Sequence, residues 1–134
     1  MTQEFWQEEF ETLGEKNLQK LQVERLNKTI ENAGRSPFYS DLFSRKKIKA
    51  GAIKDISQIT ELPFTTKQDL RDHFPYGFLS LPKKDIIRLH SSSGTTGNPT
   101  VIFHNRHDLD SWANLMARSL FCAGVRDTDV FQNI

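Results

Sequence analysis

Apolar residues recur at helical spacing along the first third of the chain. They fall at positions i, i+3, i+4 and i+7, which is the spacing that places side chains on one face of an α-helix. We therefore expect a helix over about residues 15–33, with Gly34 as its C-terminal cap. The apolar positions are Leu18, Leu21, Leu26, Ile30 and Ala33.

A second apolar stripe lies near the end of the chain. Asn105 and Asp108 have the spacing of an N-cap and its N3 partner, and Gly124 ends the pattern. This predicts a helix from about 106 to 123 whose apolar face packs in a core. The stripe consists of Leu109, Trp112, Ala113, Met116, Leu120 and Ala123.

Shorter helices are predicted by their capping residues. Ser36 followed by Pro37 predicts a helix start and a helix over 38–43. Thr65 and Gln68 have capping-box spacing, which predicts a helix from Thr66 to about residue 73. The acidic residues 2–12 form a short amphipathic piece that is suited to packing against a neighbour.

Three runs are β-like, namely residues 86–89, 101–103 and 130–134. The last two flank the second long helix, so we expect a β–α–β crossover with parallel strands. The fold class is therefore α/β, in which N-terminal helices are followed by the start of a mixed or parallel sheet. No linker divides the 134 residues, which fall into a helical lead-in (1–80) and a loop with a β–α–β unit (84–134).

Composition narrows the class of protein. Hydrophobic residues make up 37% and charged residues 26%, and the net charge of +1 gives no reason to expect nucleic acid or a membrane as a partner. Cys122 is the single cysteine, so an internal disulfide is excluded and a reducing compartment is favoured. The N-terminus lacks the apolar core of a signal peptide. We expect a cytoplasmic protein.

The candidate site is the loop between the first two β-like runs. Five hydroxyl side chains and two glycines stand within Ser91–Asn98, and Pro99 follows. Glycines allow backbone N–H groups to converge on one point, and hydroxyls add donors without bulk. Such a loop suits a polyphosphate, although a loop of this composition with no ligand is a common alternative. It is neither a Walker A motif, since Asn98 follows Gly97, nor a Gly-x-Gly-x-x-Gly motif.

The loop also resembles the phosphate-binding signature of the adenylate-forming enzymes. The phenylacetate–coenzyme A ligase branch is the most similar, because further segments of the chain match it over about residues 15–134. The resemblance implies that the chain is an incomplete part of the large N-terminal domain. The chain also ends in a β-like run, which leads us to expect a fragment of a larger enzyme. The matching segments are Leu62–Arg71, Pro75–Leu79, Arg88–Gly97, Trp112–Ser119, Ala123–Val125 and Asp129–Val130.

The resemblance implies a ligase that activates phenylacetate or a related aryl acid. ATP and the acid would give an acyl-adenylate, and coenzyme A would give the thioester, with Mg²⁺ accompanying ATP. The family's catalytic lysine lies outside this chain, so the 134 residues alone should be inactive and no catalytic residue is identified. The residues implied to bind the nucleotide are Ser91, Ser92, Ser93, Gly94, Thr95, Thr96 and Gly97.

One position departs from the family pattern. Asn98 stands where the family usually has lysine or arginine, so a compensating cation is needed. Lys67 is our candidate because it begins a predicted helix, where the helix dipole favours an anion. The alternative is an ordinary exposed lysine. His104 and His107 have a spacing compatible with metal binding, but no third ligand stands nearby, so no protein-held metal is expected.

Two other functions remain open. One is a related adenylate-forming enzyme with a different acceptor, such as the coenzyme F390 synthetase-like proteins. The other is a nucleotide-binding module without chemistry. The expected partners are small molecules, with a homodimer as a further possibility.

Overall fold

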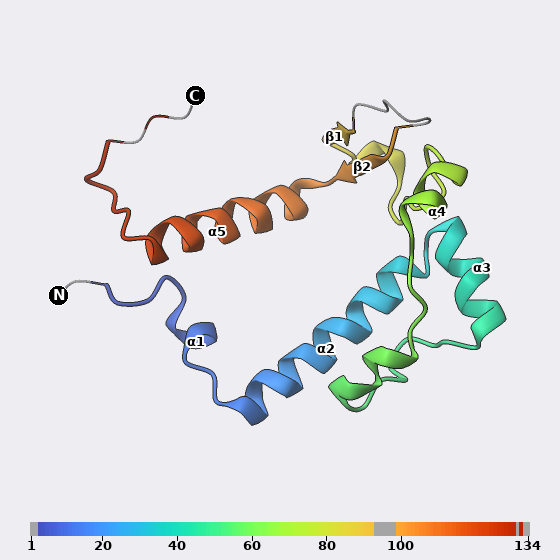
Figure 1. The fold of residues 1–134 in the computed structure, drawn as a ribbon, viewed down its shortest axis with the longest axis horizontal. Coiled ribbons are helices and arrows are strands. Elements are labelled where there is room, and N and C mark those ends of the chain that lie inside the picture. The colour runs from blue at the N-terminus through green and yellow to red at the C-terminus, as the bar shows by residue number, and fades with distance from the viewer. Residues whose placement is uncertain (1–2, 93–98, 131, 133–134) are drawn as a thin grey trace.

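The computed structural model describes residues 3–92, 99–130 and 132. Helices come first along the chain and a small sheet follows them, as the sequence predicts (Figure 1). The long helices α2 and α5 run along opposite sides of the view, with the sheet at one end and α1 at the other. The elements are α1 (Glu8–Glu11), α2 (Glu15–Ala33), α3 (Pro37–Lys46), η1 (Ile56–Glu61), α4 (Lys67–Asp72), η2 (Lys83–Asp85), β1 (Arg88–Ser91), β2 (Val101–His104) and α5 (Arg106–Cys122).

A sharp corner joins α2 to α3. Helix α2 has the predicted bounds, and Gly34 caps it in a right-handed conformation with φ −60°. Ser36 is completely buried in this corner. Its hydroxyl donates to the Ala33 carbonyl at 2.8 Å and accepts from the Tyr39 amide at 3.4 Å. One side chain therefore ends the first helix and caps the second, which extends three residues beyond the predicted end at 43.

The loop before η1 is fastened to α2 by one side chain. Asn27 donates to the Ile53 carbonyl at 2.8 Å and accepts from the Ile53 amide at 3.2 Å. Ile53 and Ile30 are the buried apolar residues among those the structure describes, at 5% and 4% exposure. The core of this part of the chain therefore lies between α2 and the η1 segment, which also contact each other.

Aromatic side chains attach α3 to the segment after α4. Phe38 stacks on Phe78 with ring centroids 4.3 Å apart, and the Phe38 amide donates to the Gly77 carbonyl at 2.9 Å. Gly77 approaches His73 so closely that a Cβ atom at residue 77 would overlap the His73 Cβ. Position 77 therefore has no room for a side chain.

The sheet differs from the predicted one. Strands β1 and β2 pair antiparallel, with Arg88 opposite His104 and Ser91 opposite Val101. The expected parallel β–α–β unit is wrong for the described residues, because Val130 and Gln132 lie in no strand. Within the described residues β1 and β2 pair only with each other, and Val130 is fully exposed, so it contacts no strand. The rest of the predicted third strand, Phe131, Asn133 and Ile134, lies outside the described residues.

Helix α5 begins and ends as predicted, but its apolar stripe is not buried. Asn105 accepts from the Asp108 amide at 2.8 Å, and Asp108 accepts from the Asn105 amide at 2.9 Å, which forms the predicted capping box. Trp112 is 46% exposed and Met116 is 52% exposed, so the expectation of a core there is wrong. Among the described residues, His90 and His104 contact Trp112 of this face, but both Trp112 and Met116 stay about half exposed. None of the described helices combines the length and apolarity that crossing a membrane requires.

Candidate functional site

The candidate loop emerges from the end of the β1–β2 hairpin. Beyond the last paired residues, the Ser92 amide donates to the Thr100 carbonyl at 3.0 Å. The Ser92 hydroxyl oxygen accepts from the Thr100 amide at 3.0 Å and lies 3.1 Å from the Thr100 hydroxyl. These contacts close the base of the loop and hold its two ends side by side.

The structure places two of the seven predicted loop residues. Ser91 is the last residue of β1, Ser92 follows it, and both are exposed. Ser93, Gly94, Thr95, Thr96 and Gly97 lie outside the described residues, as does Asn98. Their assignment to the nucleotide site therefore remains a prediction.

Lys67 is the first residue of α4 and is exposed. The predicted capping box is shifted by one residue. Thr66 caps the helix by accepting from the Asp69 amide at 3.2 Å, and Asp69 accepts from the Thr66 amide at 2.7 Å. Thr65 instead lies 2.7 Å from the hydroxyl of Tyr39. That contact explains the shift, because it takes the Thr65 side chain away from the helix.

The segment that carries Lys67 packs near the hairpin. Tyr76 stacks on Phe103 of β2 with ring centroids 5.5 Å apart. Leu70 of α4 and all three residues 101–103 line one cavity of about 200 Å³. Leu70, which belongs to the matching segment Leu62–Arg71, therefore lies close to β2, the strand that follows the candidate loop. No described hydrogen bond joins Lys67 to Ser91 or Ser92.

The histidines near the hairpin contact aromatic rings. His90 and His104 have ring centroids 4.9 Å apart, and Trp112 lies 5.3 Å from His90 and 5.8 Å from His104. Within residues 3–92 and 99–130, no three His, Cys, Asp or Glu side chains gather as metal ligands. Sequence reasoning treated these residues separately, and the antiparallel register is what brings the two histidines together.

Thr100 is the site residue that sequence reasoning missed. It lies two residues beyond the hydroxyl-rich stretch Ser91–Asn98, and we predicted no role for it from the sequence alone. Its role depends on the pairing of β1 with β2, which places it opposite Ser92. The signal that could have shown it is the pair of short β-like runs on both sides of one loop, a pattern typical of a hairpin.

The carboxyl group of Asp69 offers a direct test of the α4 start. Hydrogen bonds from the Thr66 hydroxyl and then the Thr66 amide lower the pKa of Asp69 below its ordinary value. We expect Thr66→Val to raise that pKa toward the ordinary value, as measured by ¹³C NMR titration. Since the folded-state pKa is depressed, the stability from this contact is present above the unfolded-state pKa and is lost as the pH falls through the folded-state value.

Asp55 provides the matched control. Its pKa is also lowered, by the hydroxyl and amide of Ser57, and neither group contacts Thr66. The pKa of Asp55 should stay unchanged in Thr66→Val. An unchanged pKa of Asp69 in that variant would contradict the capping geometry.

Comparison with solved structures defines the class of fold. The chain is similar to two structures of 2-hydroxyisobutyryl-CoA ligase, one with 2-HIB-AMP in the postadenylation state and one with 2-HIB-AMP and CoA in the thioesterification state. The TM-scores are 0.76 and 0.78, at 26% and 29% identity. The matches cover 87% and 88% of this chain but 26% of each ligase chain. The fold is therefore that of part of an adenylate-forming CoA ligase.

Comparison of sequences identifies more similar relatives than the solved structures do. The chain is 39% identical over 129 residues to a phenylacetate-coenzyme A ligase of Thermus thermophilus. It is 40% identical over 120 residues to the phenylacetate-coenzyme A ligase of Escherichia coli. These matches cover 96% and 89% of this chain, which spans 29% and 28% of the two relatives' length. They confirm the resemblance to phenylacetate–coenzyme A ligases. No family model matches the chain.

Proposed function

We propose that the protein to which this chain belongs is an AMP-forming ligase that activates phenylacetate or a related aryl acid. The observation that carries the proposal is the sequence similarity to phenylacetate-coenzyme A ligases over most of the chain. The structural neighbours support it, because they are CoA ligases with an acyl-adenylate and with CoA bound.

The proposed reaction has two steps. A carboxylate oxygen attacks the α-phosphorus of ATP, and the bond to the bridging oxygen breaks so that pyrophosphate leaves. The coenzyme A thiol then loses its proton, its sulfur attacks the acyl carbon, and AMP leaves with the electron pair of the broken bond. Negative charge builds on pyrophosphate in the first step, so donors aimed at the β- and γ-phosphates favour it.

The hairpin gives the loop a defined base for this role. Ser92 and Thr100 hold the two ends together, so the hydroxyl-rich residues between them share one anchoring point. We place Ser91 to Gly97 against the phosphates of ATP, and Lys67 as the cation that compensates for neutral Asn98. We propose that Mg²⁺ enters bound to the phosphates of ATP.

The test is phenylacetate-dependent ATP–pyrophosphate exchange by the protein made from the complete reading frame. We expect exchange with phenylacetate, together with thioester formation when coenzyme A is added. Exchange with another carboxylic acid, but none with phenylacetate, would keep the class and reject the named substrate. Absence of exchange with every acid tested would reject the ligase in favour of a nucleotide-binding module.

Two further points belong to the same proposal. We place the protein in the cytoplasm, where ATP and coenzyme A are available, and we keep a homodimer as the oligomeric state to test. Light scattering at working concentration would return the mass of one chain or of two. Neither point affects the exchange experiment.

A further inference from the structure

One cavity in the described structure lies away from the hairpin. It has a volume of about 600 Å³ and is lined by the N-terminal segment, α2 and α5. Figure 1 shows the N-terminal segment with α1 between the start of α2 and the C-terminal end of α5. No residue of β1 or β2 lines it, so the candidate phosphate loop does not account for it. The volume is within the range of small-molecule sites.

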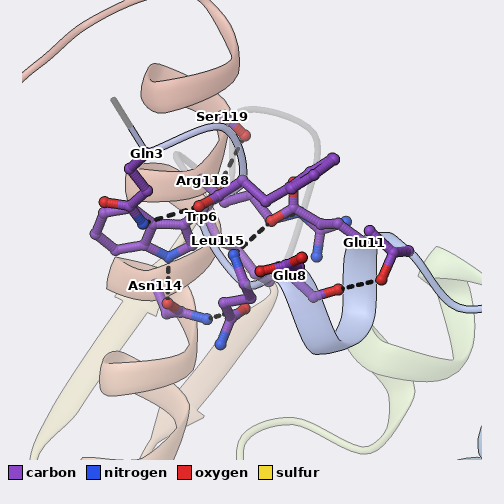
Figure 2. A network of polar contacts seen from close by, with 11 residues as sticks. Gln3, Trp6, Glu8, Glu11, Asn114, Leu115, Arg118 and Ser119 are labelled. Carbon is purple, nitrogen blue, oxygen red and sulfur yellow. Dashed lines mark hydrogen bonds and ion pairs between the residues drawn. The ribbon is translucent and has the colours of Figure 1, made fainter. Parts of the chain in front are cut away.

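Side-chain contacts hold the N-terminal segment at this cavity. The indole of Trp6 donates to the Asn114 side chain at 2.7 Å, and the Asn114 amide donates to Gln7 at 3.0 Å. Trp6 also packs on Phe121 with ring centroids 5.9 Å apart. Figure 2 shows Trp6 of the segment meeting Asn114 of α5. The segment is thus attached to a helix more than 100 residues away in sequence, and this attachment forms one wall of the cavity.

The lining combines an apolar surface with positive charge. Its charged members are Arg25, Lys28 and Arg118, and no carboxylate side chain lines it. Lys28 pairs with Glu31 at 3.1 Å, and Arg118 lies 3.9 Å from Glu11. The apolar part of the lining consists of Phe10, Leu13, Leu18, Leu21 and Leu115.

Arg25 is the least compensated cation of the three. Its guanidinium carbon lies over the Phe10 ring at 5.3 Å, and among the described residues it forms no ion pair with a carboxylate. An arginine beside an aromatic ring keeps its donors available for a planar carboxylate, which it binds with two hydrogen bonds. The leucines on the same helix face supply surface for a hydrocarbon body.

We propose that this cavity binds an organic anion with an apolar body, namely a carboxylate with an alkyl chain. Arg25 binds the carboxylate, and the leucine surface takes the chain. Charge complementarity carries the inference, because Arg25 has no carboxylate partner among the described residues and no carboxylate side chain lines the cavity. Lys28 and Arg118, by contrast, are already paired with Glu31 and Glu11. The site goes beyond the proposed ligase activity and is separate from the acid that the enzyme would activate.

Decanoate is the probe, and isothermal titration calorimetry on the protein from the complete reading frame is the measurement. We expect saturable binding of one decanoate that persists at saturating phenylacetate and ATP, with at least tenfold weaker binding of uncharged decanamide. Arg25→Gln should weaken decanoate binding about tenfold, the size of one lost charge-assisted contact. Exchange activity of the variant should be unchanged.

Two further variants make the result specific. Lys20→Gln removes a cation from α2 at a position that does not line this cavity, and it should leave binding unchanged. Leu21→Gln should weaken binding of decanoate more than that of shorter hexanoate. Loss of binding in the presence of phenylacetate would assign decanoate to the ligase site and overturn the proposal. Absence of saturable binding would overturn the proposal, and this is the result expected if other parts of the protein fill the cavity. Equal binding of decanoate by Arg25→Gln and the unchanged protein would overturn it as well.

Discussion

Replacing Lys67 by methionine should raise the Michaelis constant for ATP about 10- to 100-fold in pyrophosphate exchange. The reason is the neutral Asn98 in the proposed phosphate loop, which in our proposal leaves the γ-phosphate without the cation that the family usually places there. Lys67 is exposed, and Leu70 of the same helix lines a cavity together with residues 101–103 of β2. Hydrogen bonds to charged groups contribute about 1.5–3 kcal/mol, which corresponds to this range of affinity.

Two other variants separate a specific contact from a general loss of charge. Lys84 is an exposed lysine in η2, so Lys84→Met should leave the Michaelis constant unchanged. Asn98→Lys should restore much of the ATP affinity that Lys67→Met loses, because it returns a cation to the loop. An unchanged Michaelis constant and unchanged turnover in Lys67→Met would show that Lys67 is an ordinary surface lysine.

Helices are the part of the fold that the sequence predicts best. Their ends depend on local chemistry, namely a side chain that satisfies backbone amides within a few residues. Helix α2 and the Asn105–Asp108 capping box follow the prediction for this reason. The box at α4 was misplaced by one residue because Thr65 and Thr66 are both suitable caps, and only the tertiary contact with Tyr39 distinguishes them.

Strand pairing could not be predicted in the same way. Whether two β-like runs pair with each other or with a more distant run depends on neighbours that spacing does not reveal. The β1–β2 hairpin, and with it the role of Thr100, therefore appears only in the structure. The prediction that the Trp112–Met116 face is buried was wrong for a related reason. An apolar stripe shows that a face is suited to burial, but it does not identify the segment that covers it.

The candidate site also has one part that the sequence predicts and one part that only the structure shows. The residue types of the loop and their resemblance to a known signature point to phosphate binding from sequence alone. The geometry that supports this function comes from long-range contacts, in particular the Ser92–Thr100 pairing and the packing of Leu70 beside β2. Chemistry that is carried by consecutive residues is predictable, whereas chemistry that needs two segments together requires the fold.

Ile30→Ala should have the largest effect on stability. Ile30 is 4% exposed, and with Ile53 it forms the buried apolar pair of the described structure. Shortening a buried isoleucine to alanine costs about 2–5 kcal/mol, since it removes apolar contacts and leaves a cavity. We expect the opening free energy of α2 to fall by this amount, as measured by hydrogen exchange of α2 amides with mass spectrometric detection.

Leu18→Ala provides the matched control on the same helix. Leu18 is 41% exposed, so its truncation removes a comparable side chain from a partly hydrated position. It should lower the opening free energy by about 0.5 kcal/mol or less. Equal effects of the two variants would mean that α2 is stabilised by helix formation alone. A larger effect of Ile30→Ala, accompanied by faster exchange of the Ile53 amide that Asn27 binds, would show that α2 and the η1 segment open as one unit.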